Sequence, residues 1–219
     1  EPFNLMPFPC GNTGCQMGGW FNRPIESMDD LRGLKMRIPG IGGEVLQRAG
    51  GTPVNLPASE IFTALQTGSI DATEWVSPYN DVAMGLHQAA RYYYYPGWQE
   101  PGPTLECIVN MDVWNSLPPD LQAIVRIACQ ATNLDMVSEF MARNASSLEQ
   151  LTVDESVEIR AFPEDVLAGI KALTLEVVEE LAARDPVSAR VWKSYQDFMQ
   201  RSQPWQAISE QAMLATNLL

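Results

Sequence analysis

Histidine and basic residues are scarce in this sequence. Its 219 residues include one histidine, His87, which excludes most schemes in which an imidazole activates a serine or cysteine nucleophile. The sequence has 14 lysines and arginines against 27 aspartates and glutamates, which gives a formal net charge of −13. Such a balance argues against nucleic acid and anionic membrane surfaces as partners, because both require a basic face. A small anionic ligand is still compatible with it, since one buried arginine can hold such a ligand.

Long apolar runs are absent, and cysteines are few. No run approaches the ~18 residues that span a bilayer, which predicts a soluble protein. Cys10 and Cys15 lie close enough to bridge a loop, and they could equally remain free thiols, whereas Cys107 and Cys129 have the surroundings of core residues. A zinc site is disfavoured because the Cys-x4-Cys pair has no second Cys/His pair to complete four ligands.

Residues 34–75 show the pattern of a compact α/β layer. Gly-rich and Pro-rich turns separate three strands from two helices, in the order β-α-β-α-β, over 34–39, 40–49, 52–56, 57–67 and 70–75. The first strand, LKMRIP, alternates in polarity, so Arg37 should point away from the side occupied by Met36 and Ile38. The following GIGG lacks the spacing of either phosphate-binding fingerprint.

The strand at 70–75 ends in a carboxylate and an indole, Glu74 and Trp75. In open α/β sheets the carboxyl ends of the strands are where ligands bind. The alternative is that Trp75 belongs to the core and Glu74 to the surface. Both interpretations are compatible with this stretch alone.

The rest of the chain predicts a loop, several strands and long helices. The Pro- and Gly-rich residues 1–15 should be mostly loop. The run 105–111 has apolar residues at both odd and even positions, so both faces of the strand would be buried, which is typical of a central strand. A helix of roughly 30 residues from 121 to 151, on the order of 45 Å long, should link two lobes or support a subunit contact. Further strands are expected at 16–21, 92–95 and 157–162, and further helices at 78–90, 163–183, 186–201 and 205–219.

Two kinds of site are compatible with the polar residues. Arg37 can bind a carboxylate bidentately, while Gln16, Glu74 and Glu100 offer hard oxygens to a cation, with Trp75, Trp98 and the tyrosines of 92–95 excluding water. Alternatively, Glu74 and Glu100 form the acid/base pair of a hydrolase. An enzyme would change its ligand chemically, and a receptor would not.

Several motifs taken together resemble the solute receptors of TRAP transporters, the DctP-like family. They are the strand LRGLKMRIP, the helix–strand unit PASEIFTALQTGSIDATEW, the turn YPGWQEPG and the helix start WNSLPPDLQ. The resemblance covers nearly the whole chain and is greatest to the branch that binds 2-oxo and 2-hydroxy monocarboxylates. It implies a two-lobed α/β periplasmic binding protein, type II-like, with a long inter-lobe helix and no enzymatic activity.

The resemblance also implies a division of the chain and a set of site residues. Residues 1–15 would be part of a first lobe, 16–111 the α/β ligand-binding lobe, and 112–219 the connecting helix and a C-terminal helical region with one strand. Family members are longer at the N-terminus, so the sequence is expected to be an incomplete piece. Expected partners are the membrane permease subunits and a second copy of the chain, bound through the C-terminal helices. The ligand would be a 2-oxo acid such as pyruvate or a lactate-like 2-hydroxy acid. The substrate-binding residues would be Gln16, Arg37, Trp75 and Asn80. A cation would be bound by Gln16, Glu74, the Trp75 backbone and Glu100, with Gln99 as the alternative to Glu100. The first candidate for this cation is sodium, and the alternative is calcium.

Overall fold

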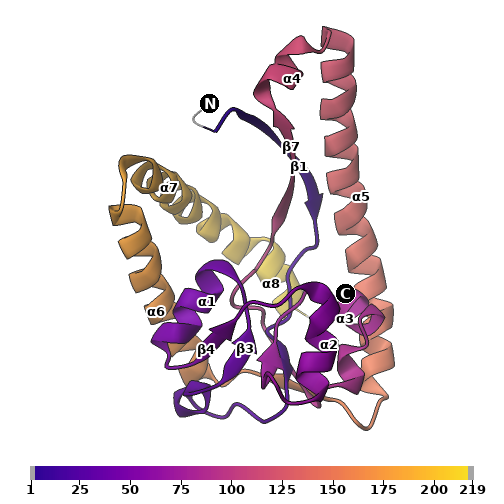
Figure 1. Ribbon diagram of the computed structural model, residues 1–219, viewed down its shortest axis with the longest axis vertical. Helices are drawn as coiled ribbons and strands as arrows, with labels where there is room; N and C mark the ends of the chain where they lie inside the picture. The colour runs from indigo at the N-terminus through magenta and orange to yellow at the C-terminus, as the bar shows by residue number, and fades with distance from the viewer. Residues whose placement is uncertain (1–2, 217–219) are drawn as a thin grey trace. The chain divides into compact units, whose positions relative to one another are not determined.

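The computed structural model describes residues 3–216, which fall into two compact units, one ending at Ile170 and the other beginning at Lys171. Figure 1 labels most of the helices and several of the strands. In chain order the elements are β1 (Leu5–Asn12), β2 (Gly19–Phe21), η1 (Met28–Leu31), β3 (Lys35–Arg37), α1 (Gly40–Arg48), β4 (Thr52–Val54), α2 (Ala58–Gln66), β5 (Ala72–Thr73), α3 (Pro78–Ala83), η2 (Leu86–Gln88), β6 (Tyr92–Tyr95), β7 (Thr104–Asn110), α4 (Met111–Ser116), α5 (Pro119–Thr152), β8 (Glu158–Ala161), α6 (Glu164–Ala183), α7 (Pro186–Ile208) and α8 (Glu210–Ala215).

The larger sheet has the strand order β4-β3-β5-β2-β6-β8. β3 is parallel to both β4 and β5, and β2 is antiparallel to β5 and β6. The predicted β-α-β-α-β pattern is therefore confirmed, and so is the α/β fold class. Met36 and Ile38 are buried on the side of β3 opposite Arg37, as the alternation predicted. The parallel pairing brings the carboxyl ends of β3 and β5 to the same edge, which is the edge that matters for the site.

A second sheet, as far as residues 3–216 show, consists of the antiparallel strands β1 and β7. The expectation of a loop over residues 1–15 was wrong for 5–12, because this stretch pairs with a partner about a hundred residues away, which local pattern cannot show. Strand β1 tolerates Pro7 and Pro9 because, within residues 3–216, no second strand pairs with its other edge. The central position expected for 105–111 was also wrong: in the same part of the chain β7 pairs with β1 alone, and Ile108 is 55% exposed.

Helix α5 confirms the long helix expected from 121 to 151, and it runs along β1 (Figure 1). Phe8 of β1 and Trp114 of α4 pack at a ring distance of 4.8 Å, and Cys129 of α5 joins the same cluster. Further along α5, Phe140 packs edge-on against Tyr79 of α3 at 5.5 Å. One helix thus contacts both the β1–β7 ribbon and the helix that follows the larger sheet's β5.

The core of the larger sheet is organised around stacked aromatic rings. Trp20 and Tyr93 lie 4.0 Å apart, both fully buried, over a cluster that includes Ile61 and Leu86. Gly19 makes this packing possible: its φ is +118°, and a Cβ there would lie 2.4 Å from the Thr73 carbonyl oxygen. The glycine thus allows the backbone of β2 to approach Thr73 of β5 closely.

Three further element boundaries differ from the expectations. The helix expected over 78–90 ends at Ala83, since Gly85 has a φ of +72° and starts a separate 3₁₀ turn. The helix expected to end at 201 continues through Pro204 to Ile208, and residues 217–219 of the last expected helix lie outside the described residues. The first strand of the larger sheet begins at Gly19 rather than Gln16. Among residues 3–216, no helix combines the length and apolarity needed to cross a membrane.

Candidate functional site

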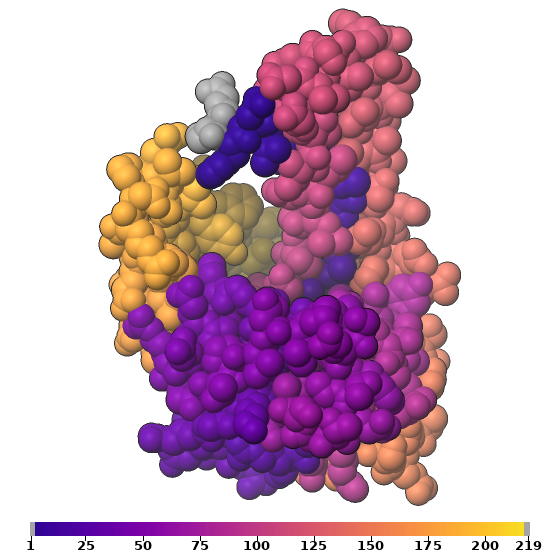
Figure 2. Space-filling model, viewed as in Figure 1, coloured from indigo at the N-terminus to yellow at the C-terminus, as the bar shows by residue number. Residues whose placement is uncertain are grey.

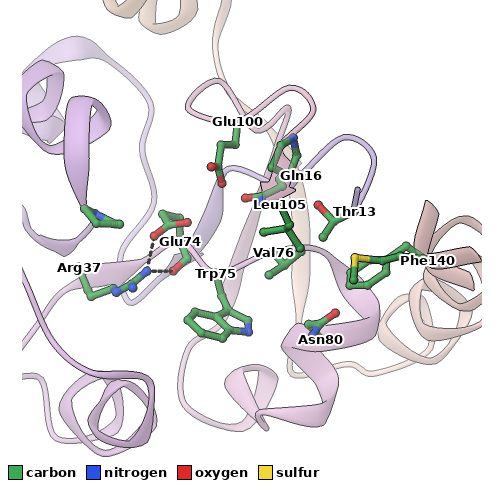
Figure 3. Close-up of a pocket in the computed structure, with 13 residues that line it drawn as sticks. Thr13, Gln16, Arg37, Glu74, Trp75, Val76, Asn80, Glu100, Leu105 and Phe140 are labelled. Atoms are coloured by element: carbon green, nitrogen blue, oxygen red, sulfur yellow. Dashed lines mark hydrogen bonds and ion pairs between the residues drawn. The ribbon is translucent and has the colours of Figure 1, made fainter. Parts of the chain in front are cut away.

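A pocket of about 480 Å³ opens at the carboxyl edge shared by β3 and β5. Figure 3 shows its walls: the ends of these strands on one side, the segment before β2 and the turn after β6 on another, and α3 with α5 on a third. Its lining consists of Thr13, Gln16, Arg37, Pro39, Glu74, Trp75, Val76, Asn80, Glu100, Pro103, Leu105, Met136 and Phe140.

Arg37 and Glu74 form a buried ion pair in this pocket. Arg37 ends β3 and is in register with Thr73, so the residue after β5 meets it directly. The Arg37 Nη1 donates to the Glu74 carboxylate and, at 3.5 Å, to the Glu74 carbonyl oxygen. The guanidinium also lies 5.4 Å from the centre of the Trp75 ring, within cation–π distance. Its Nε is buried and has no hydrogen-bond partner among the described residues.

The Glu74 carboxyl has an unusual electrostatic environment. Only 4% of the residue is exposed, and this burial raises its pKa to about 7. The Arg37 charge opposes that rise, whereas the carboxylates of Glu100 and Asp81 add to it. Glu74 is therefore a carboxylate that burial and like charges disfavour, and additional positive charge nearby would stabilise it.

Gln16 and Glu100 meet through the turn that follows β6. The Gln16 N–H donates to the Glu100 carbonyl at 3.3 Å, and the Gly97 N–H donates to the Gln16 carbonyl at 3.0 Å. A Cβ on Gly97 would lie 2.4 Å from the Gln16 carbonyl oxygen, so this turn requires glycine. In Figure 3 the Glu100 carboxylate extends from the turn toward Gln16 and Glu74. The side-chain oxygens of Gln16 and Gln99 are buried without a hydrogen-bond partner in the described part of the chain.

Asn80 lines the opposite wall of the pocket, on α3. Its neighbour Asp81 is a buried carboxylate that the sequence analysis missed, and it fixes the loop that precedes α3. Asp81 accepts hydrogen bonds from the Tyr93 hydroxyl at 2.8 Å, the Trp20 indole at 3.0 Å and the Val76 N–H at 3.1 Å. Burial raises the pKa of Asp81 to about 6 even though these donors act in the opposite direction. The signal available in the sequence was an acidic residue in the first turn after Ser77–Pro78.

All six predicted site residues line this one pocket: Gln16, Arg37, Glu74, Trp75, Asn80 and Glu100. Two expectations about the walls differ, because Trp98 does not belong to the lining and the tyrosines at 93 and 94 are buried in the core. Sequence reasoning also missed Thr13, Leu105 and the α5 residues Met136 and Phe140. They come from distant segments, and only the tertiary fold brings them to the pocket.

The pocket offers two complementary sets of unsatisfied groups. The donors are the Arg37 Nε–H and the Trp75 indole N–H, and the acceptors are the side-chain oxygens of Gln16 and Asn80; all four are buried without partners among residues 3–216. Buried polar groups without partners are costly, and a bound ligand is one way to satisfy them. The arrangement fits an anion near Arg37 and a hard cation near the oxygens.

Comparison with known proteins identifies the family. Residues 3–185 match the family described as bacterial extracellular solute-binding protein, family 7 (DctP). The chain belongs to this family. Because the family consists of transport solute-binding proteins, the alternative of a hydrolase using Glu74 and Glu100 is not supported.

Two solved structures and a curated protein resemble the chain over nearly its whole length. A TRAP periplasmic solute-binding protein from Colwellia psychrerythraea with bound calcium and pyruvate is 45% identical, with a TM-score of 0.94 over 98% of this chain and 66% of its own. One from Pseudoalteromonas atlantica T6c with bound sodium and pyruvate is 42% identical, with a TM-score of 0.92 over 98% of this chain and 65% of its own. A monocarboxylate 2-oxoacid-binding periplasmic protein from Nostoc is 41% identical over 95% of this chain. This chain thus spans 57% of the length of that Nostoc protein.

Proposed function

We propose that this family 7 protein binds a small organic monocarboxylate, a 2-oxo acid such as pyruvate or a lactate-like 2-hydroxy acid, together with a cation. It acts in the periplasm and delivers the acid to the membrane subunits of a TRAP transporter. The observation that carries the proposal is the convergence, in one pocket, of a buried guanidinium and buried oxygens that lack partners. Pyruvate in two relatives that are 42% and 45% identical supports the same ligand class. The division into a ligand-binding lobe at 16–111 and a connecting region at 112–219 stays a prediction.

Arg37 is the residue proposed to hold the ligand carboxylate. Its Nη1 is engaged by Glu74, but its Nε–H has no partner in the described chain, so one side of the guanidinium can receive a second carboxylate. The Trp75 indole N–H and the amide of Asn80 offer further contacts to the oxygens of an acid. Desolvated donors of this kind reject a ligand that cannot accept from them, which gives selectivity.

Gln16, Glu74, Glu100 and the Trp75 backbone are the groups proposed to hold the cation. They fit a hard cation for two reasons. The Gln16 side-chain oxygen is buried without a partner in residues 3–216. Burial and the Glu100 charge both raise the pKa of Glu74, so nearby positive charge would stabilise its ionised form. When bound, the cation supplies positive charge to this acidic cluster. Sodium remains the first candidate and calcium the alternative; calcium would offset both carboxylates, and sodium one of them.

The proposal is tested by titrating the purified chain with pyruvate and lactate, each with sodium, with calcium or with chelator, and recording thermal unfolding. A ligand present at ~100 times its dissociation constant should stabilise by about 2.7 kcal/mol, a rise of roughly 5–10 °C for a protein of this size. Arg37→Met should abolish the rise. Lys35→Met is the matched control on the same strand, because Lys35 is exposed and outside the pocket.

Two results would contradict the proposal. One is a thermal shift that survives Arg37→Met unchanged, which would show that the ligand is held elsewhere. The other is the absence of any shift with either acid under all cation conditions. Conversion of the acid into a new compound would point back to an enzyme.

A second copy of the chain is proposed as a further partner, bound through the C-terminal helices. Helix α7 exposes large apolar side chains at the coiled-coil spacing, Val191, Tyr195, Phe198 and Trp205. A relative from Bordetella bronchiseptica, 35% identical over 98% of this chain and 64% of its own, with a TM-score of 0.94, is described as a mixed occupancy dimer. Phe198→Glu should shift sedimentation toward the monomer, whereas Gln200→Glu, also exposed on α7, should leave it unchanged. A wild-type chain that sediments as a monomer at every concentration would exclude this partner.

A further inference from the structure

Three cysteines from three distant segments converge between the β1–β7 ribbon and α5. Cys129 on α5 is 5% exposed, and Cys10 of β1 and Cys107 of β7 pack against the cluster that contains it. Cys107 is in register with Phe8, and Cys10 lies two residues further along β1, at the point where the register shifts between Pro9 and Gly11. The spacing of Cys10 and Cys15 suggested a local bridge, but Cys10 is directed instead toward the interface with α5.

Strand β1 and helix α5 pack against each other at this place. A Cβ on Gly11 would lie 2.8 Å from the sulfur of Met136, so the side chain of Met136 packs directly over the strand next to Cys10. In the space-filling view, atoms of β1 (indigo) lie between those of β7 and α5 (Figure 2). Close approach of the two segments is the condition for a covalent bond between their side chains.

The three thiols share one hydrophobic cluster. Burial raises the pKa of the Cys129 thiol to about 11, and the neighbouring thiols of Cys10 and Cys107 add to the rise. All three are free thiols in the structure, and so is Cys15, which is exposed. Cys10 adjoins Gly11, whose position meets the side chain of Met136, so Cys10 lies where β1 contacts the helix that carries Cys129. Cys10 is also not directly opposite Cys107 in the ribbon, which disfavours a cross-strand bond between those two.

We propose that Cys10 and Cys129 form a disulfide that ties β1 to α5 under oxidising conditions, with Cys107 as a third thiol able to exchange with it. The oxidant is a small or protein disulfide. The Cys10 thiolate attacks one sulfur of the oxidant and releases its first thiol; the Cys129 thiolate then attacks the Cys10 sulfur and releases the second. Cys10 and Cys129 together lose two protons and two electrons, and the oxidant is reduced to two thiols.

The bond would lie beside the pocket wall. Cys10 precedes the pocket residue Thr13 by three positions, and Cys129 lies two helical turns before the pocket residue Met136. It would close a loop of about 120 residues, which predicts a rise in melting temperature of roughly 10 °C. The second step should be slow near neutral pH and faster as pH rises, because little of the Cys129 thiol is ionised.

The test uses the native chain and oxidised glutathione as the probe. After incubation, peptide mapping without reductant should show a Cys10–Cys129 cross-link, two fewer titratable thiols and the higher melting temperature, all reversed by dithiothreitol. Cys15→Ala and Cys107→Ala should retain the cross-link and the thermal gain. Cys129→Ala should lose the gain and accumulate a mixed disulfide with glutathione at Cys10 or a bond from Cys10 to Cys107.

Several results would overturn the inference. They are four thiols that stay free in the native oxidised sample, a Cys10–Cys15 linkage in the wild-type chain, or a Cys10–Cys129 bond that appears only in denaturant. A cross-link that forms equally fast at pH 7 and pH 9 would contradict the assignment of Cys129 as the slow second nucleophile. None of these readouts depends on ligand binding, so failure here leaves the proposed function untouched.

Discussion

Asp81 provides a sharp test of the electrostatics beneath the pocket. The carboxyl is buried, and it accepts from Trp20, Tyr93 and Val76. Three donors would by themselves favour the ionised form and lower the pKa, whereas loss of solvent favours the neutral form and raises it. Desolvation is the larger effect, and it leaves the pKa of Asp81 at about 6 against an ordinary value of 3.8.

The sign of the pH dependence follows from this difference. Between 3.8 and 6 the folded state holds a proton on Asp81 that the unfolded state has lost, so the contribution of Asp81 to stability falls as pH rises through that window. From pH 4 to pH 6.5 the loss amounts to about 2 kcal/mol. Asp81→Asn cannot ionise and should not show it. The stability of the variant relative to wild type should therefore improve by about 2 kcal/mol over this range.

Urea denaturation at pH 4, 5 and 6.5 measures this difference, and the comparison with wild type cancels groups common to both proteins. Asp135→Asn, which removes an exposed carboxylate on α5, is the control and should show a nearly constant difference. If the difference between Asp81→Asn and wild type is independent of pH, the three donors cancel the effect of burial on the pKa. The conclusion that desolvation is the larger effect at Asp81 would then be wrong.

Two further predictions concern packing around the same sheet. Gly19→Ala should lower the free energy of unfolding, measured by heat or urea, by more than about 2 kcal/mol. The reason is that the φ of +118° and the Thr73 carbonyl oxygen, 2.4 Å from the new Cβ, both oppose an alanine. A loss of stability below about 0.5 kcal/mol, roughly that of a surface substitution, would refute the close approach. Ile61→Ala should cost about 2–5 kcal/mol since Ile61 is fully buried, while Ile41→Ala, at a residue 49% exposed on α1, should cost well under half of that. Equal losses at the two isoleucines would contradict the assignment of the core.

Local pattern predicted those parts of the fold whose interactions are local. The alternation of LKMRIP and the turns around it located β3, α1, β4, α2 and β5, because each short connection leaves few ways to close a parallel layer. The long helix α5 was predicted almost to its ends, since a Pro-rich start and about thirty residues without Pro or Gly determine it locally. Gly85 shows the limit: one residue at positive φ ended a helix that composition alone would have continued.

Pairings between distant segments were beyond such reasoning. Strand β1 contains Pro7, Pro9 and Gly11, a composition typical of loops, and it is a strand because β7 and α5 hold it on two sides. Because Cys10 and Cys129 are far apart in the sequence, local pattern did not show that they share one cluster, and it suggested the nearer Cys15 as the partner of Cys10. In both cases the sequence shows which residues are present, and only the tertiary fold shows which of them meet.

The candidate site combines features that local pattern predicts with contacts that only the tertiary fold shows. The carboxyl-edge rule predicted that Glu74 and Trp75 would lie at a ligand-binding edge, and Arg37 was predicted to bind a carboxylate. Neither prediction included the pairing of Arg37 with Glu74. This pairing alters the proposed binding of a carboxylate ligand, which would share the guanidinium with Glu74 instead of meeting an unpaired cation. A guanidinium has five N–H donors in a planar fork, and the Arg37 Nε–H has no partner in the described chain. In the proposed complex, the ligand carboxylate would bind on that side while Glu74 stays in place and holds the guanidinium in one orientation.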